Sequence, residues 1–471
     1  MAAQKLPDKG SSTITSDPGI PGHGPFKTYW KYRIHPLANI QSLSLPESTD
    51  FAIVGSGITG LGVCKTLLET CPTKTVTVLE ACSLCSGATG SDCGLFSVNT
   101  GETYISLARL HGAQTAGDII RFNFRNLQQL AEFASRHKES EPVYEERSVL
   151  RVFFDSRSFE AARKSIMQLE EDHHSLRDIF TIVDARTVEN CYGVYGAVGG
   201  MKFPGGIIRP YPLVTETFRE LVAAHGRRFS LETYTPVLSV TFEPQSNPSH
   251  PYCINTPRGA LRAATVAYCI NAYSQHLIPG VDGLITPQKF TMTVQDPDRC
   301  MRRGSFALSW GSLSPTVHNQ KNRDWSNTLH YLLQSAKTGY MYFGCADVCP
   351  YVCISSANNN TADHHSVFLL QEKLSCLLRK VRLPKWPLVS VWSGLMGCSF
   401  DGLPIVGKLP SSLTQRDSDS EWIAAAFNGY GMANCLLSGE ALARMMVGED
   451  VSSWFPEAYR ISYRRFNNLW V

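Results

Sequence analysis

The sequence predicts an α/β fold that begins with a βαβ unit of the Rossmann type. The apolar run DFAIVG at 50–55 is typical of a buried parallel strand. The glycine-rich turn GSGITG at 55–60 and the helical pattern LGVCKTLLET follow it directly. The run TKTVTVLE then supplies a second strand, which ends in Glu80. Strand, turn, helix and strand therefore occur in the order that a dinucleotide-binding unit requires.

The bulk composition limits the classes of protein and partner. The chain has 471 residues, 43% hydrophobic and 18% charged, as in globular proteins of two or three domains. Its net charge of +3 does not favour nucleic acid or an anionic membrane as a partner. No apolar run reaches the ~18 residues of a membrane span, and the N-terminus shows no secretory signal. We therefore expect a cytoplasmic protein, with an N-terminal arm over 1–44 that is disordered up to about residue 26.

The glycine turn and the acid that follows it predict a dinucleotide site. Gly55 permits a tight turn, Gly57 lets the backbone approach a pyrophosphate, and Gly60 lets the helix pack on the sheet. Glu80 is placed to accept hydrogen bonds from a ribose diol. The alternative is an accidental glycine turn beside a surface acid, which the complete βαβ order disfavours. The motif by itself does not separate FAD from NAD.

The stretch after Glu80, ACSLCSGATGSDCG at 81–94, favours FAD. Its three cysteines, Cys82, Cys85 and Cys93, leave a redox or metal site open, but a zinc site needs a second matching pair. A plain surface loop is another alternative. A chain that follows an extended FAD needs small side chains and available donors, and 86–94 contains three glycines. We therefore predict that this loop lies along FAD, that the cysteines are reduced thiols, and that no metal is bound.

These residues, with several later motifs, resemble the D-amino-acid-oxidase-like FAD-dependent oxidoreductases, which include sarcosine, glycine and γ-glutamylputrescine oxidases. The particular likeness is to a fungal branch, which reads SGATGRNGG where 86–94 reads SGATGSDCG. The motifs that carry it are YW at 29–30, HPL at 35–37, GGIIRP at 205–210, CINAYS at 269–274, GYMYFG at 339–344, WSGLMG at 392–397, DGLPIVG at 401–407 and FNGYGM at 427–432.

The resemblance implies FAD as the cofactor and a set of residues around it. The resemblance implies that the turn at 427–432 and the N-terminus of the helix after it face the flavin. The physics agrees, since a helix dipole stabilises the anion that builds on the flavin on reduction. The residues expected to bind FAD are Gly55, Ser56, Gly57, Ile58, Thr59, Gly60, Glu80, Ala81, Ser86, Thr89, Gly90, Val237, Asn271, Asp401, Asn428, Gly429, Gly431 and Met432.

The resemblance also implies two interleaved domains. The FAD-binding domain is expected at 45–106, 206–286 and 392–471, and a mixed-sheet substrate domain at 107–205 and 287–391. Within the second domain, AGDIIRFNFRNLQQLAEFASRHK and FEAARKSIMQLEED have the apolar spacing of amphipathic helices. KFTMTVQ and LHYLLQ alternate apolar and polar residues, as strands do.

The activity that the resemblance implies is oxidation of a C–N bond in a small-molecule amine to an imine, with O2 reduced to H2O2. Specialised metabolite biosynthesis is one setting for such a reaction. Two departures from the family concern the flavin side. Ser91, Asp92 and Cys93 replace Arg-Asn-Gly, and Ala433 stands where sarcosine oxidases have a lysine that grips the substrate carboxylate. The alternative function is an FAD protein that catalyses a redox-neutral isomerisation or cyclisation, or that has lost its activity.

Four residues are candidates for catalysis or substrate binding. A buried substrate carboxylate needs a cation, for which Arg209 and Lys289 are the candidates, whereas Arg460 favours a surface position. Cys93 and Cys398 are the candidates for a covalent bond to the flavin. We predict non-covalent FAD, because a reactive thiolate needs a nearby cation and Cys93 follows an acid.

Overall fold

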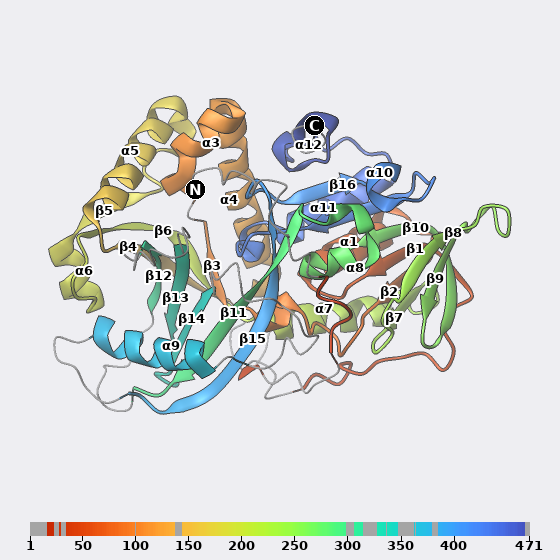
Figure 1. Ribbon diagram of the computed structural model, residues 1–471, viewed down its shortest axis with the longest axis horizontal. Helices are drawn as coiled ribbons and strands as arrows, with labels where there is room; N and C mark the ends of the chain where they lie inside the picture. Colours follow the sequence, from red (N-terminus) through yellow and green to blue (C-terminus); the bar gives the residue numbers. More distant parts are fainter. Residues whose placement is uncertain are drawn as a thin grey trace, which may run out of the picture.

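The computed structural model describes residues 17–22, 28–29, 34–98, 100–136, 144–297, 306–313, 327–335, 337–346, 362, 364–378 and 385–466. These residues form two β-sheets that lie side by side, each with helices packed on it (Figure 1). Across the described residues, every helix is too short or too polar to traverse a lipid bilayer.

The first sheet contains the predicted βαβ unit. Its strands follow the order β16-β17-β10-β1-β2-β7, with β9 paired to β10 and to β8. β1 is parallel to both β10 and β2, and α1 connects β1 to β2, which confirms the elements expected at 50–80. The bounds are β1 (Ser48–Val54), α1 (Ile58–Thr70), β2 (Val76–Leu79), β7 (Phe229–Glu232), β8 (Ser239–Phe242), β9 (Tyr252–Thr256), β10 (Gly259–Tyr268), β16 (Ile405–Lys408) and β17 (Glu421–Ala425).

Two helices that pack on the first sheet, α1 and α11, approach each other so closely that their backbones are in contact. A Cβ atom on Gly62 would lie 2.6 Å from the carbonyl oxygen of Leu436, and one on Gly439 would collide with the carbonyl oxygen of Thr59. Glycine at both positions therefore brings the N-termini of the two helices to the same edge of the sheet. The helices are α2 (Ala88–Ser91), α7 (Pro210–His225), α8 (Ser274–Leu277), α10 (Ser411–Thr414), α11 (Cys435–Met446) and α12 (Tyr463–Phe466).

The second sheet is mixed, with the order β15-β11-β14-β13-β12-β4-β6-β3 and β5 beside β6. Its pairs are antiparallel except β4 with β12. The bounds are β3 (Leu95–Ser97), β4 (Tyr144–Phe153), β5 (Thr181–Asp184), β6 (Gly199–Ile208), β11 (Ile285–Gln295), β12 (Phe306–Leu313), β13 (Asn327–Gln334), β14 (Met341–Ala346) and β15 (Leu388–Ser399).

Helices cover both faces of the second sheet (Figure 1). Side chains of α3, α4 and α5 share one apolar core with β4, β6 and β11, and those of α9 share another with β13 and β14. The bounds are α3 (Tyr104–His111), α4 (Ala113–Ser135), α5 (Ser156–Asp172), α6 (Ala185–Tyr192) and α9 (His364–Leu377). The helices expected from the first insertion and the strands β11 and β13 are thus confirmed.

Strands of the two sheets alternate along the chain. β1 and β2 belong to the first sheet, β3 to β6 to the second, β7 to β10 to the first, β11 to β15 to the second, and β16 and β17 to the first. This interleaving confirms the predicted fold class, while the exact domain boundaries stay a prediction. Most of the expected N-terminal arm lies outside the described residues. Within it, Asp17 pairs with His276 at 2.9 Å, and Cys82 contacts Pro21.

Candidate functional site

Three glycines shape the turn between β1 and α1. Gly55 has a φ of +105°, and a Cβ there would lie 2.6 Å from the carbonyl oxygen of Cys269, just after β10. A Cβ on Gly57 would lie 3.0 Å from Thr89 Oγ1, and one on Gly60 would collide with the carbonyl oxygen of Gly55. The turn therefore presents backbone rather than side chains at the N-terminus of α1, as a phosphate site requires.

Glu80 is a buried carboxylate that accepts hydrogen bonds from four donors. Its side chain lies directly after β2, and the residue is 8% exposed. Oε2 accepts from the amide and the hydroxyl of Ser56 at 3.1 and 2.6 Å. Oε1 accepts from the amide of Cys82 at 3.0 Å and the hydroxyl of Ser86 at 3.3 Å. The hydroxyl donors can rotate away in favour of a ribose diol, while the backbone donors keep the carboxylate in place.

The loop after Glu80 runs from this carboxylate to the N-terminus of α1 and on to the second sheet. Thr89 Oγ1, within α2, accepts a hydrogen bond from the amide of Ile58 at 3.1 Å. Two residues later, the carbonyl oxygen of Ser91 accepts from Trp392 Nε1 of β15 at 2.9 Å. Ala81 and Gly90 lie on the same path. The loop thus has the course that we expect of a segment lining an extended cofactor.

Non-glycine residues with a left-handed backbone gather where β10, β15 and β17 end. Asn271, Ala426 and Asn428 have φ values of +46°, +61° and +56°. Asn271 Oδ1 accepts from the amide of Ala426 at 2.9 Å, and Asn428 Oδ1 accepts from the amide of Ser399 at 2.8 Å. Strained backbone concentrates at functional sites, and ligands of open α/β sheets bind outside the carboxyl ends of the strands. The predicted residues Asn271 and Asn428 meet at this edge.

The N-terminus of α11 is held by α4 of the second half. Asn126 Nδ2 donates to the carbonyl oxygen of Met432 at 2.8 Å, and Asn126 Oδ1 accepts from the amide of Leu437 at 2.9 Å. Asn123 Nδ2 donates to Asn434 Oδ1 at 2.7 Å. The sequence analysis missed both α4 asparagines. The pattern that could have revealed them in the sequence is a pair of amide side chains on the apolar face of an amphipathic helix.

Two predicted cofactor residues have other partners. Asp401 forms a bidentate ion pair with Arg465, with contacts of 2.8 and 2.9 Å. Arg465 also donates to the carbonyl oxygens of Leu403, Pro404 and Tyr459, so it ties the C-terminal segment to the DGLPIVG turn. Val237 is buried, close after the segment where the amide of Thr235 donates to the carbonyl oxygen of Glu80 at 2.8 Å. A contact of Asp401 or Val237 with the cofactor stays a prediction.

The candidates for catalysis lie on separate elements. Arg209 is the half-buried N-cap residue of α7, and Lys289 is half-buried on β11 opposite Leu395 of β15. Cys398 Sγ contacts Gln288 Oε1 at 3.2 Å. Arg460 pairs with exposed Glu457 at 3.2 Å, in keeping with a surface position.

Burial keeps the candidate thiols protonated. It raises the pKa of Cys398 to about 12. It also raises the pKa of Cys93 well above the usual range, with a smaller contribution from the charge of Asp92. Neither thiol is therefore a thiolate at neutral pH.

The loop cysteines Cys82 and Cys85 carry thiols that are not joined in a disulfide, and Cys85 is buried with a φ of +55°. The amide of Cys85 donates to Ser56 Oγ at 2.9 Å, so this cysteine supports the glycine turn. Among the described residues, no group of three or more His, Cys, Asp or Glu side chains is arranged to hold a metal ion.

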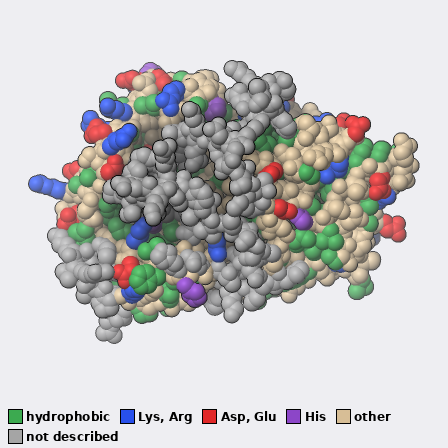
Figure 2. Space-filling view, in the orientation of Figure 1, with side chains coloured by type: hydrophobic (Ala, Val, Ile, Leu, Met, Phe, Trp, Pro, Cys, Tyr) green, Lys and Arg blue, Asp and Glu red, His purple; other side chains and the backbone are tan. Residues whose placement is uncertain are grey.

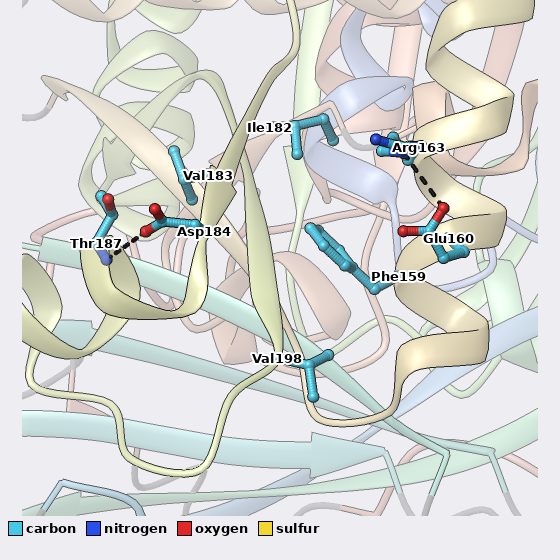
Figure 3. Close-up of a pocket in the computed structure, with 8 residues that line it drawn as sticks. All are labelled: Phe159, Glu160, Arg163, Ile182, Val183, Asp184, Thr187 and Val198. Atoms are coloured by element: carbon cyan, nitrogen blue, oxygen red, sulfur yellow. Dashed lines mark hydrogen bonds and ion pairs between the residues drawn. The ribbon is translucent and has the colours of Figure 1, made fainter.

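A groove of about 460 Å³ on the second half lies between α5, β5 and α6 (Figure 3). Its charged groups already have partners. Arg163 pairs with Glu160 at 3.2 Å, and Asp184 accepts from the amide of Thr187 at 2.7 Å as the cap of α6. None of the predicted site residues lines this groove, so it is separate from the candidate site.

Comparisons with known proteins were made by family and by structure. The family model described as "FAD dependent oxidoreductase" matches residues 50–445. A comparison by sequence with curated proteins finds no match.

Solved structures with the same fold cover nearly the whole chain. Glycine oxidase from Geobacillus kaustophilus is 16% identical, with a TM-score of 0.63 over 88% of this chain and 99% of that one. L-Proline dehydrogenase from P. horikoshii is 16% identical, with a TM-score of 0.64 over 90% and 99%. NikD, described as an unusual amino acid oxidase essential for nikkomycin biosynthesis, is 17% identical, with a TM-score of 0.62 over 87% and 98%.

Proposed function

The chain belongs to the family of FAD-dependent oxidoreductases, and on that premise we propose that it oxidises a C–N bond in an amine or amino-acid-like substrate. The amine becomes an imine, and O2 accepts the electrons and is released as H2O2. The observation that carries the proposal is the continuous course of the loop from Glu80 past Thr89 to Trp392.

The residues along this course fit FAD. Gly55 and Gly57 leave backbone at the N-terminus of α1, where the pyrophosphate would bind, and Glu80 would hold the adenosine ribose. Gly431 and Met432 precede α11, whose N-terminal dipole would favour negative charge on the ring. When bound, FAD supplies the hydride acceptor of the reaction.

The protein's own part in the reaction is to position the amine and exclude water. Phe290, Met292, Trp392 and buried Cys93 belong to one apolar core next to the loop. Such surroundings favour a neutral amine over an ammonium ion. The names of the structural relatives (glycine oxidase, proline dehydrogenase and the amino acid oxidase NikD) support an amine substrate and, with NikD, a biosynthetic setting. Membership of a fungal branch remains part of the proposal.

The test is anaerobic reduction of the purified protein by a panel of amines. The panel contains glycine, L-proline, sarcosine and N-methylbenzylamine, so that substrates with and without a carboxylate are compared. We expect a yellow protein whose visible flavin band bleaches with at least one amine, followed by H2O2 release when O2 is admitted.

Three other outcomes would each contradict part of the proposal. A colourless protein that consumes NADH would contradict FAD as the cofactor. A yellow protein that dithionite bleaches but no amine reduces, and that rearranges an amine without using O2, would favour the redox-neutral alternative. Bleaching by amines without H2O2 release would indicate a dehydrogenase.

A further inference from the structure

Asp92 lies in the loop that continues from Glu80 past the N-terminus of α1. Its Oδ1 accepts a hydrogen bond from the amide of Gly94 at 2.7 Å. The neighbouring residues Ser91, Cys93 and Gly94 are buried, whereas Asp92 keeps part of its surface accessible. Burial nevertheless raises the pKa of Asp92 to about 7. Asp92 is therefore a partly accessible acid within an otherwise buried stretch of the loop.

Elements from distant parts of the sequence close around this acid. Cys435, the first residue of α11, has its pKa raised to about 12 by burial and, less strongly, by the charge of Asp92. β15 contacts Ser91, the residue before Asp92. Trp392 on β15 donates to the carbonyl oxygen of Ser91, and a Cβ on Gly394 would lie 3.2 Å from Ser91 Cβ. Asp92 is therefore near both the N-terminus of α11 and the second sheet.

The other titratable side chains on these elements are Glu80, Cys82, Cys85 and Cys93 in the loop, Tyr430 in the turn before α11, Cys435, Glu440 and Arg444 on α11, and Cys398 on β15, with Lys289 on the adjacent β11. Burial raises the pKa of Cys93, Cys435 and Cys398, so these thiols stay protonated near neutral pH. Asp92 differs from them because its carboxyl group changes charge close to pH 7.

The order of residues along the loop indicates what Asp92 faces. Glu80 marks the ribose end, and Thr89 stands beside the pyrophosphate position at the N-terminus of α1. Asp92 is the next polar side chain after Ser91 in the direction of α11, where the reactive ring of FAD would lie under the proposed function. We propose that Asp92 is the proton acceptor of the active site, whose carboxylate binds the ammonium group of a cationic amine and takes a proton from its nitrogen. This inference rests on the proposed function.

The step involves one proton and no change of oxidation state. An N–H bond of the ammonium group breaks, an O–H bond forms on Asp92, and both partners become neutral. The amine keeps the electron pair as a lone pair, which is the form from which the carbon-bound hydrogen can leave as hydride. A carboxylate beside the reacting nitrogen also repels a second anion, so the favoured substrates are amines without a carboxylate next to the nitrogen.

The first test uses the flavin of the holoenzyme as the probe. The visible absorption band is recorded between pH 5 and 9 for the wild type, Asp92→Asn and Asp118→Asn. Asparagine keeps an acceptor for the amide of Gly94 but carries no charge. Asp118 on α4, whose side chain is 47% exposed and pairs with Arg121, serves as the matched control. We expect a spectral shift with one midpoint near pH 7 in the wild type and Asp118→Asn, and no shift in Asp92→Asn at equal FAD content.

The second test follows kcat/KM against pH for the amine that bleaches the flavin most readily. The wild type should gain activity as pH rises through the pKa of Asp92, because the carboxylate is the active form. Asp92→Asn should lose that rise and about 100-fold in kcat/KM at pH 8, the usual contribution of a general base.

The outcomes separate the inference from the proposed function. A yellow protein whose spectrum does not titrate, or titrates equally in Asp92→Asn, would overturn the role of Asp92 alone. A protein without FAD would overturn the proposed function and the inference with it. If Asp92→Asn loses FAD, Asp92→Glu is the decisive variant. It should restore FAD binding and the pH titration of the visible flavin band, with a displaced midpoint.

Discussion

At the scale of single residues, the site depends on buried groups whose partners are satisfied before any ligand arrives. Glu80 accepts four hydrogen bonds from the glycine turn and the following loop, so it orients both. Cys93 and Cys398 are held protonated by burial. Each of these residues therefore has a structural role as well as a predicted place near the cofactor.

The first prediction concerns Glu80. Replacing it with alanine removes the acceptor for the ribose and leaves the amides of Ser56 and Cys82 without a partner. We expect FAD binding to weaken by about 1–3 kcal/mol, the usual cost of unpaired buried donors. Fluorescence titration of the apoprotein with FAD measures this. Glu80→Gln keeps one carbonyl acceptor and should lose less, whereas an unchanged affinity in Glu80→Ala would exclude a contact with the ribose.

The second prediction is that FAD is not covalently bound. A thioether bond to the flavin needs a thiolate, and the raised pKa values of Cys93 and Cys398 oppose its formation. Acid precipitation should therefore release all of the yellow colour into the supernatant. A pellet that stays yellow in the wild type and turns white in Cys93→Ser or Cys398→Ser would contradict this.

At the scale of elements, the close packing of α1 on α11 sets the position of both N-termini. The packing depends on Gly62 and Gly439, where the two backbones touch. One helix end serves the predicted pyrophosphate position and the other the predicted ring position. A change in their separation would therefore affect both ends of the cofactor site.

The third prediction tests this packing. Gly62→Ala would place a Cβ atom 2.6 Å from the carbonyl oxygen of Leu436, so the helices must move apart. We expect the free energy of unfolding to fall by about 1–3 kcal/mol, as for other overpacked sites, and FAD affinity to fall with it. Urea unfolding followed by circular dichroism measures the loss. Gly87→Ala is the control for the stability measurement, because Gly87 has a φ of −78° and no atom within 4 Å of its Cβ position. An equal loss of stability in both variants would rule out the helix contact as the cause.

At the scale of the whole molecule, the two interleaved halves are joined at the site itself. Asn126 of α4 connects the second half to the N-terminus of α11 in the first. β15 extends from the second sheet to Asn428, and Trp392 on it contacts the loop after Glu80. In the space-filling view, charged side chains are scattered over the visible face outside the grey regions, with hydrophobic side chains between them (Figure 2).

The fourth prediction concerns this junction. Asn126→Ala leaves the carbonyl oxygen of Met432 and the amide of Leu437 without their buried partner. We expect a loss of about 2–4 kcal/mol in stability and weaker FAD binding, because two buried polar groups become unsatisfied. Thermal unfolding with and without added FAD measures both. Gln128→Ala, at an exposed position of the same helix, should change stability by less than about 0.5 kcal/mol. Equal losses of stability in Asn126→Ala and Gln128→Ala would mean that Asn126 stabilises only α4 and not its contact with α11.

The sequence alone determined the βαβ unit, the glycine turn, Glu80 and the amphipathic helices, because the spacing of apolar and glycine residues within a short segment specifies local structure. The resemblance to a family added the interleaved order of the domains. The contacts of Asn126 with α11, of Arg465 with Asp401 and of Asp92 with its surroundings were decided only by the tertiary structure. Asn126 and Leu437, for example, are 311 residues apart. The partner of a buried polar side chain depends on which distant elements pack against it, and no local pattern encodes that choice.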